Sequence, residues 1–247
     1  MTNYRSILPA SLSVILLAGV VACSGGDLLL PQDAQEVQLG AIGGNEQTGT
    51  VGETLPKPLT VELRDEQGRP IVGRRVAFAV VDGPDAATLT PDTAVTDGDG
   101  EAVGQWILGK VAGVYTAEAR VLPAEDEVPG AELPVAQFTA SAQAGPPNTL
   151  QTESKTTQIG DRGEPVDEDP LVRVADRYGN PIEGVAVHWQ IRDGEGQVSS
   201  ATTTTGADGR TSVTWTLESR GGHRLEASVD GEVDGLPAVF IAFVYIN

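Results

Sequence analysis

The chain contains two histidines, His188 and His223, and few other side chains suited to acid–base chemistry near neutral pH. A Ser-His-Asp hydrolase needs a serine and a carboxylate positioned against the histidine, and the sequence signals no such set. His188 stands between the apolar residues Val187 and Trp189, which places it on the outward face of an alternating strand. We therefore expect no enzymatic activity, no catalytic residue, no cofactor and no small-molecule substrate.

Acidic segments at 97–101, 123–127 and 165–169 are candidate calcium ligands, because calcium prefers about six to eight oxygen atoms. The first, DGDGE, lacks the spaced carboxylates and the closing glutamate of an EF-hand loop. A matching segment at 206–210, GADGR, keeps the glycines but has a single aspartate. Since the turn repeats and its charge does not, we expect no metal ligands there. Zinc is disfavoured as well, because the chain has one cysteine.

Overall charge limits the possible partners. Lysine and arginine total 16 against 35 aspartate and glutamate residues, for a formal net charge of -19. Such a chain repels phosphate groups, so nucleic acid is excluded as a partner.

The first 22 residues read as a secretory signal. Arg5 is their only charged residue, and an uncharged, mostly apolar run extends from Ile7 to Ala22. That run is shorter than the roughly 20 residues that span a bilayer as a helix. We therefore expect a cleaved leader.

The single cysteine follows this leader. Val20, Val21, Ala22 and Cys23 resemble the bacterial lipobox, and the resemblance implies cleavage before Cys23 and a diacylglycerol thioether on its sulfur. The alternative is an ordinary signal peptide cleaved near Ala22, which leaves Cys23 as a free thiol. Ser24, in place of the aspartate that retains such proteins at the inner membrane, favours outer-membrane delivery.

A long internal repeat organises the rest of the chain. The segment DEQGRPIVG at 65–73 returns as DRYGNPIEG at 176–184, and TDGDGEA at 96–102 returns as TGADGRT at 205–211. A tryptophan follows the second segment of each copy, Trp106 in the first copy and Trp215 in the second. Two copies of one domain follow from this repeat.

Alternating apolar residues around these segments predict strands. Val185, Val187, Trp189 and Ile191 share one face, and Val76, Phe78 and Val80 match them in the first copy. Leu59, Val61 and Leu63, and Val172 with Val174, predict the preceding strands. The Asp-x-x-Gly-x-Pro element between them is a turn. Trp106, Trp189 and Trp215 fall at inward positions, where core packing is favoured over carbohydrate stacking. The run AVFIAFVYIN at 238–247 predicts a last, buried strand.

These patterns predict an all-β protein of two tandem immunoglobulin-like antiparallel β-sandwich domains. The predicted boundaries are 1–22 for the signal peptide, 23–36 for the lipidated cysteine and tether, 37–145 for the first domain and 146–247 for the second. Adjacent prolines in AQAGPPNT at 142–149 stiffen the link between the domains.

Both copies resemble bacterial immunoglobulin-like domains of group 1, the invasin and intimin type. The segments that carry this resemblance are VELRDEQGRPIVGRRVAFAV at 61–80 and VADRYGNPIEGVAVHWQI at 174–191. The resemblance implies an envelope location and a role in binding, adhesion or spacing. A competing interpretation treats the copies as carboxypeptidase regulatory-like or transthyretin-like repeats of an accessory protein to an envelope enzyme or secretion system, and strand order separates the two.

The expected protein is thus a non-enzymatic lipoprotein, anchored to the outer membrane or cell surface through Cys23. Its expected partners are the membrane, through the lipid, and a protein or carbohydrate at the cell surface.

Overall fold

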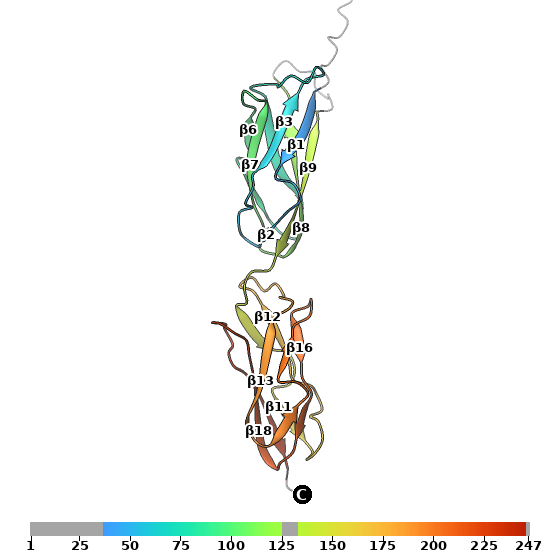
Figure 1. The fold of residues 1–247 in the computed structure, drawn as a ribbon, viewed down its shortest axis with the longest axis vertical. Helices are drawn as coiled ribbons and strands as arrows, with labels where there is room; N and C mark the ends of the chain where they lie inside the picture. Colours follow the sequence, from blue (N-terminus) through green and yellow to red (C-terminus); the bar gives the residue numbers. More distant parts are fainter. Residues whose placement is uncertain (1–36, 125–132, 246–247) are drawn as a thin grey trace, which may run out of the picture. The chain divides into compact units, whose positions relative to one another are not determined.

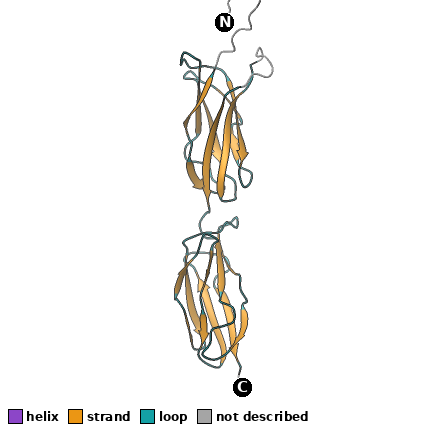
Figure 2. Ribbon diagram, turned by 90° about the vertical axis from the view of Figure 1, so that its right-hand side faces the viewer, coloured by secondary structure: helices purple, strands orange, loops and turns teal. Residues whose placement is uncertain are grey.

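The alternating apolar residues of the sequence form β-strands whose inward side chains build two cores. A computed structural model describes residues 37–124 and 133–245. All the regular secondary structure within these ranges is β-strand. Figure 1 shows two sandwiches, and Figure 2 shows the strands of each in facing layers. The all-β fold is therefore confirmed.

The described residues of the first sandwich form nine strands. They are β1 (Gln38–Gly43), β2 (Gln47–Thr50), β3 (Leu59–Arg64), β4 (Arg75–Asp82), β5 (Thr88–Thr90), β6 (Thr93–Val95), β7 (Glu101–Ile107), β8 (Gly113–Val121) and β9 (Val135–Gln143). One sheet has the order β1-β3-β7-β5 and the other β2-β9-β8-β4-β6.

The second sandwich repeats this arrangement, and its residues up to 245, which the structure describes, form ten strands. They are β10 (Thr149–Thr152), β11 (Thr157–Gly160), β12 (Leu171–Ala175), β13 (Ala186–Asp193), β14 (Gly196–Val198), β15 (Thr202–Thr204), β16 (Arg210–Ser212), β17 (Trp215–Leu217), β18 (Gly221–Ser228) and β19 (Ala238–Val244). The sheet order β11-β19-β18-β13-β15 faces the shorter sheets β10-β12-β16 and β14-β17.

Strand order identifies the fold. The order β1-β3-β7-β5 opposite β9-β8-β4 is the ABED and GFC arrangement of an immunoglobulin sandwich. The predicted immunoglobulin-like fold is confirmed, and this order favours it over the transthyretin-like interpretation.

Each sandwich has its own core. Trp106, Tyr115 and Phe138 are fully buried in the first, and Trp215 and Phe240 in the second. The predicted inward position of all three tryptophans is confirmed, since Trp189 is also buried. The division into domains at 145 and 146 stays a prediction, and both sandwiches belong to one compact unit.

Strand pairing shows how the chain runs through a sandwich. β1 starts beside the end of β3, where Gln38 pairs with Arg64. β9 runs parallel to β2 and ends beside it, where Gln143 pairs with Thr50. Figure 1 shows these two places at opposite ends of the first sandwich. We call the end where β1 or β10 starts the proximal end, and the end where β9 or β19 finishes the distal end.

The last strand differs from the sequence-based expectation of a buried segment. β19 alternates between buried and less buried positions because it packs on the core with one face only. Its outward residues Ile241 and Phe243 are 38% and 43% exposed, and the following Tyr245 is 68% exposed. β19 is therefore a half-buried central strand that carries apolar side chains on its outer face.

The leader and Cys23 lie outside the described residues, so the lipidation site stays a prediction. Within residues 37–124 and 133–245, no helix has the length and apolar character needed to cross a membrane.

Candidate functional site at the joint between the sandwiches

The turn between β12 and β13 is organised by Asp176. Its Oδ1 accepts hydrogen bonds from the backbone amides of Tyr178 at 2.8 Å and Asn180 at 2.9 Å. Gly179 has φ of 86°, a left-handed conformation that favours glycine, and donates its amide to the carbonyl of Asp176 at 3.0 Å. The turn predicted for this motif is confirmed.

Asn180 connects this turn to the loop between β7 and β8 of the first sandwich. Its Oδ1 accepts a hydrogen bond from the Ala112 amide at 2.8 Å, and its Nδ2 donates to the Lys110 carbonyl at 2.8 Å. Nδ2 also lies 2.9 Å from Oδ2 of Asp176, which holds the amide group in place. The buried Asn180 side chain thus bonds backbone groups of the neighbouring sandwich on both sides.

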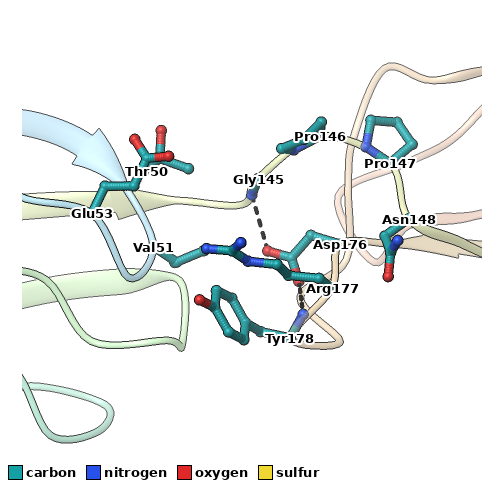
Figure 3. Close-up of a pocket in the computed structure, with 10 residues that line it drawn as sticks. All are labelled: Thr50, Val51, Glu53, Gly145, Pro146, Pro147, Asn148, Asp176, Arg177 and Tyr178. Atoms are coloured by element: carbon teal, nitrogen blue, oxygen red, sulfur yellow. Dashed lines mark hydrogen bonds between the residues drawn. The ribbon is translucent and has the colours of Figure 1, made fainter.

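Asp176 makes a third bond across the joint. Its Oδ2 accepts a hydrogen bond from the amide of Gly145 at 2.9 Å, in the segment that follows β9 (Figure 3). Pro146 and Pro147 come next, and their rings fix φ near -65°. The linker is therefore held by its own prolines and by a buried carboxylate.

Tyr178 fills the space beside these bonds. Its ring packs against the core of the first sandwich and lies over Gly52, where a Cβ atom would come within 2.7 Å of the tyrosine oxygen. The Arg177 guanidinium lies 4.6 Å and the Lys110 ammonium 5.7 Å from the ring centroid, within cation–π range. Tyr178 is thus an apolar contact between the sandwiches, flanked by two cations.

A hollow of about 200 Å³ lies along this seam. Small-molecule pockets commonly measure about 300–1,000 Å³, so the hollow is small for such a ligand. Figure 3 shows that residues of the linker, both sandwiches and the Asp176 turn share its wall. The lining residues are Thr50, Val51, Glu53, Gly145, Pro146, Pro147, Asn148, Asp176, Arg177 and Tyr178.

The hydrogen bonds to Asp176 determine its charge state. Burial alone raises the pKa of a carboxyl group, but the Asn180 side chain and the amides of Gly145, Asn180 and Tyr178 outweigh burial and lower the pKa of Asp176. Asp176 is therefore a carboxylate at neutral pH, as its four donors require.

The matching turn of the first sandwich is closed by its own side chains. Asp65 accepts hydrogen bonds from the amides of Gln67 at 3.0 Å and Arg69 at 2.8 Å. The Arg69 Nε then donates to Asp65 Oδ2 at 2.7 Å. The corresponding Oδ2 of Asp176 instead accepts hydrogen bonds from the Gly145 amide and from Nδ2 of Asn180. The same motif therefore forms an internal ion pair in one copy and a joint in the other.

The acidic segments do not converge on a metal site within the described ranges. Asp97 accepts the amides of Asp99 and Glu101, both at 3.0 Å, so its carboxylate serves the turn. No group of three or more His, Cys, Asp or Glu side chains suited to a metal occurs within 37–124 and 133–245. Residues 125–127 of the second segment lie outside these ranges.

The two histidines occupy different environments. His188 faces outward as predicted, with Nδ1 3.1 Å from the Thr202 hydroxyl and Nε2 3.7 Å from Asp230. His223 is buried, and its Nε2 lies 3.0 Å from the carbonyl oxygen of Ser219. Because a carbonyl oxygen only accepts hydrogen bonds, His223 donates from Nε2 to the backbone. The hydroxyl of Ser219 takes no part in this contact.

Comparison with known families identifies the second sandwich. Residues 169–244 match the family described as bacterial Ig-like domain (group 1). The second sandwich is a group 1 bacterial Ig-like domain.

The chain is also similar to several solved structures. The chain is similar to InvD of Yersinia pseudotuberculosis, with 17% identity over 84% of this chain and 57% of that chain, at a TM-score of 0.50. It also matches FdeC, an Escherichia coli adhesin, with 23% identity over 84% of this chain and 63% of that one, at a TM-score of 0.45. The D0-D1 domain of intimin gives 20% identity, 85% and 98% coverage, and a TM-score of 0.31. The likeness to InvD shows the fold. No curated protein sequence gives a significant match.

The joint of the group 1 domain was not predicted from the sequence, although its turn and the proline linker were. Both copies have the turn, so the repeat alone gives no reason for it to contact another domain. The available signal was the difference between the copies, because Arg69 and Gln67 stand where the second copy has Asn180 and Tyr178. An uncharged amide and an aromatic ring at an exposed turn favour a contact with a neighbouring surface.

Proposed function

We propose that this protein is a non-enzymatic, lipid-anchored lipoprotein of the bacterial envelope whose two immunoglobulin-like domains act as a spacer for binding at the cell surface. Cys23 carries the lipid, residues 37–145 and 146–247 form the two domains, and the anchored membrane is the outer one. This is a binding or stalk role of the kind that group 1 domains suggest.

The joint is the observation that carries the spacer role. A spacer transmits position only if its domains do not swivel freely, and domains in one chain move relative to each other by default. Here Asn180 and Asp176 make three hydrogen bonds of 2.8–2.9 Å to backbone groups outside their own sandwich. Buried bonds of this kind resist rotation because breaking one leaves a buried polar group without a partner.

The chain path through each sandwich also suits a spacer. Because β2 runs parallel to β9 and β11 runs parallel to β19, the chain leaves each sandwich at its distal end. A domain that receives the chain at one end and releases it at the other adds its full length to the distance spanned.

The proposed partner is a protein or carbohydrate at the cell surface, and the composition disfavours anionic surfaces. The net charge of -19 repels phosphate and anionic lipid headgroups. Attachment to the membrane is therefore assigned to the lipid alone.

Mass spectrometry of the full-length protein extracted from membranes tests the anchor. We expect a diacylglycerol adduct and loss of the first 22 residues, with both absent in Cys23→Ala. A wild-type chain without acyl mass, released from cells as freely as the variant, would overturn the anchored interpretation.

Paired spin labels test the joint. The labels are placed on cysteines at Thr139 and Asp230 of the full-length protein, in a Cys23→Ala background. We expect Asn180→Ala to broaden the distance distribution, while Arg69→Ala at the matching turn leaves it unchanged.

A glycine pair controls for backbone strain in the same experiment. Gly52→Ala and Gly163→Ala both place a side chain at positive φ, but only the first pushes against Tyr178, since the Gly163 site has no atom within 4 Å. We expect broadening for Gly52→Ala alone. Equal distributions in all four variants would show that the turn does not hold the joint.

A further inference from the structure

The joint between the sandwiches is made of two halves. One half is the turn at 176–180, which presents the Tyr178 ring and the Asn180 amide group. The other half is the distal end of the first sandwich, where Gly52 lies under the tyrosine and the Lys110 carbonyl accepts a hydrogen bond from Asn180 at 2.8 Å. We call these halves the docking turn and the docking seat. Because the sandwiches are copies, the first has a counterpart of the turn and the second a counterpart of the seat.

The counterpart of the docking turn is closed by Arg69. The Asp65 carboxylate accepts backbone amides at 2.8 and 3.0 Å, so the backbone of this turn matches that of the docking turn. Arg69 stands in the place of Asn180, and its Nε donates to Asp65 at 2.7 Å within the turn itself. The side chain that would reach a neighbouring backbone is therefore bonded inside its own sandwich.

The counterpart of the docking seat is centred on Gly163. Gly52 and Gly163 both have positive φ, of 73° and 87°. Each precedes a glutamate whose carbonyl accepts a leucine amide, from Leu108 in the first sandwich and from Leu217 in the second. A Cβ atom at Gly52 would lie 2.7 Å from the Tyr178 oxygen, whereas a Cβ atom at Gly163 would have no described atom within 4 Å beyond its chain neighbours. The place where an aromatic ring rests on the first sandwich is therefore open on the second.

Arg162 closes this second seat. The residue before the glycine is Val51 in the first sandwich, where it is buried and shares the wall of the hollow with Tyr178 (Figure 3). In the second sandwich it is the exposed Arg162, whose Nε donates to the Glu218 carbonyl at 2.9 Å. Glu218 lies in the loop between β17 and β18, the counterpart of the loop that offers the Lys110 carbonyl. A hydrogen bond from the same sandwich thus occupies the acceptor of this seat.

A difference in charge separates the joint from the two closed halves. Where the halves meet, the chain has the uncharged residues Asn180 and Val51. Where they do not meet, it has Arg69 and Arg162, and each arginine bonds a polar group of its own sandwich. Contact between the closed halves would also bring both guanidinium groups to one interface, and like charges across a contact are destabilising. We propose that Arg69 and Arg162 prevent copies of this chain from docking head to tail.

Head-to-tail docking would continue from copy to copy. The turn of one copy on the seat of the next is a heterologous contact, which leaves a turn and a seat exposed and extends into an open chain. Closing both halves limits docking to the joint within each copy. This proposal rests on the joint and requires neither the lipid anchor nor a surface partner, so its failure alone leaves the proposed function untouched.

Opening the two halves in separate proteins tests this role. The turn variant carries Gln67→Tyr and Arg69→Asn, which install the residues of the docking turn. The seat variant carries Arg162→Val, which installs the residue of the docking seat. Both are full-length chains in a Cys23→Ala background. Because each variant opens one half only, we expect each alone to stay monomeric and the mixture to form a one-to-one pair.

Cross-linking with a bismaleimide traps this pair, which is weak because no linker raises the local concentration of the two halves. Glu66→Cys is added to the turn variant and Glu164→Cys to the seat variant. These positions are the counterparts of Arg177 and Glu53, which share the wall of the hollow at the joint. We expect about tenfold more cross-linked pair from the two open variants than from mixtures in which either arginine is retained.

Arg192→Val is the matched control for the seat variant. It removes the same charge from an exposed site on β13, where Arg192 bonds Glu226 at 2.7 Å. We expect cross-linking at the level of the mixtures that retain an arginine, and circular dichroism to show the parent fold in every variant. Equal cross-linking with Arg192→Val and Arg162→Val, or no increase when both halves are open, would overturn the proposal.

The converse substitution at the joint tests the same role without association. Asn180→Arg installs the residue of the first sandwich in the docking turn, and the spin labels at Thr139 and Asp230 report on the joint. We expect the new arginine to bond Asp176, as in the matching turn, and to broaden the distance distribution at least as much as Asn180→Ala. A distribution that Asn180→Ala broadens and Asn180→Arg leaves narrow would also overturn the proposal. A distribution that neither substitution broadens would overturn the joint itself.

Discussion

The two sandwiches share several buried contacts and differ most at their surfaces. Thr96 and Thr205 show the agreement: each hydroxyl donates to a carbonyl at 2.7 Å and accepts an amide at 2.9 Å, at the corresponding place in its sandwich. The surface differences lie at the turns of Asp65 and Asp176 and on the outer face of the last strand of each sandwich. Duplication thus separates what the fold requires from what each copy does with its surface.

The largest effect tests whether the two cores are independent. Trp106→Ala and Trp215→Ala each remove a fully buried side chain, which should cost about 3–5 kcal/mol. We expect scanning calorimetry to show that each substitution lowers the transition of its own sandwich. Equal shifts of both transitions by Trp106→Ala would show that the sandwiches unfold as one unit.

A smaller loss of stability is expected at Tyr115, a core position at which the two copies differ. The buried Tyr115 hydroxyl bonds the Asp85 carboxylate and lies 2.8 Å from the Val111 carbonyl oxygen. Burial, and then Asp85, raise the pKa of Tyr115, so the hydroxyl remains a donor. Tyr115→Phe should destabilise the first sandwich by about 1–3 kcal/mol in denaturant unfolding.

His223 provides the comparison for Tyr115, since Tyr115 pairs with Ala140 as His223 pairs with Ala242. Nδ1 of His223 is buried without a hydrogen-bond partner, so one polar atom already carries a cost. His223→Phe should therefore cost less than Tyr115→Phe. A larger cost would show that the histidine ring is held by more than its bond to Ser219.

Acid should weaken both turns. The Arg69 amide and side chain lower the pKa of Asp65 despite burial, and hydrogen bonds lower that of Asp176. A lowered folded pKa gives stability that is complete above the ordinary carboxyl value of 3.8 and is lost as pH falls below it. We expect melting temperatures measured from about pH 6 to about pH 2 to fall more in the parent than in Asp176→Asn. Parallel profiles would exclude Asp176 as a source of the pH dependence.

The smallest effect concerns the outer faces. Ile159→Thr installs the residue of the first sandwich at a position more than half exposed, so the free energy of unfolding should change by no more than about 0.5 kcal/mol. Thermal unfolding of the monomer at low concentration measures this. A large loss of stability would mean that the Ile159 side chain stabilises the fold itself.

The sequence predicted the features that depend on periodicity and local turn chemistry. Val187 and Trp189 alternate with His188, which was sufficient to assign the inward face, and the Asp-x-x-Gly-x-Pro turn followed from its glycine and proline. The outer face of β19 was missed because Ile241 and Phe243 interrupt the polar alternation, so the run resembled a fully buried strand. The bonds of Asn180 were missed because contacts between domains leave no period in the chain.

The partners of Asn180 have a consequence for how such chains change over time. Both groups it bonds in the first sandwich are main-chain atoms, the Lys110 carbonyl and the Ala112 amide. Any loop with the same backbone course offers the same donor and acceptor, whatever its side chains. A module with this turn can therefore be placed behind another, or copied in series, and keep these two hydrogen bonds without a change in the side chains of the loop that Asn180 meets.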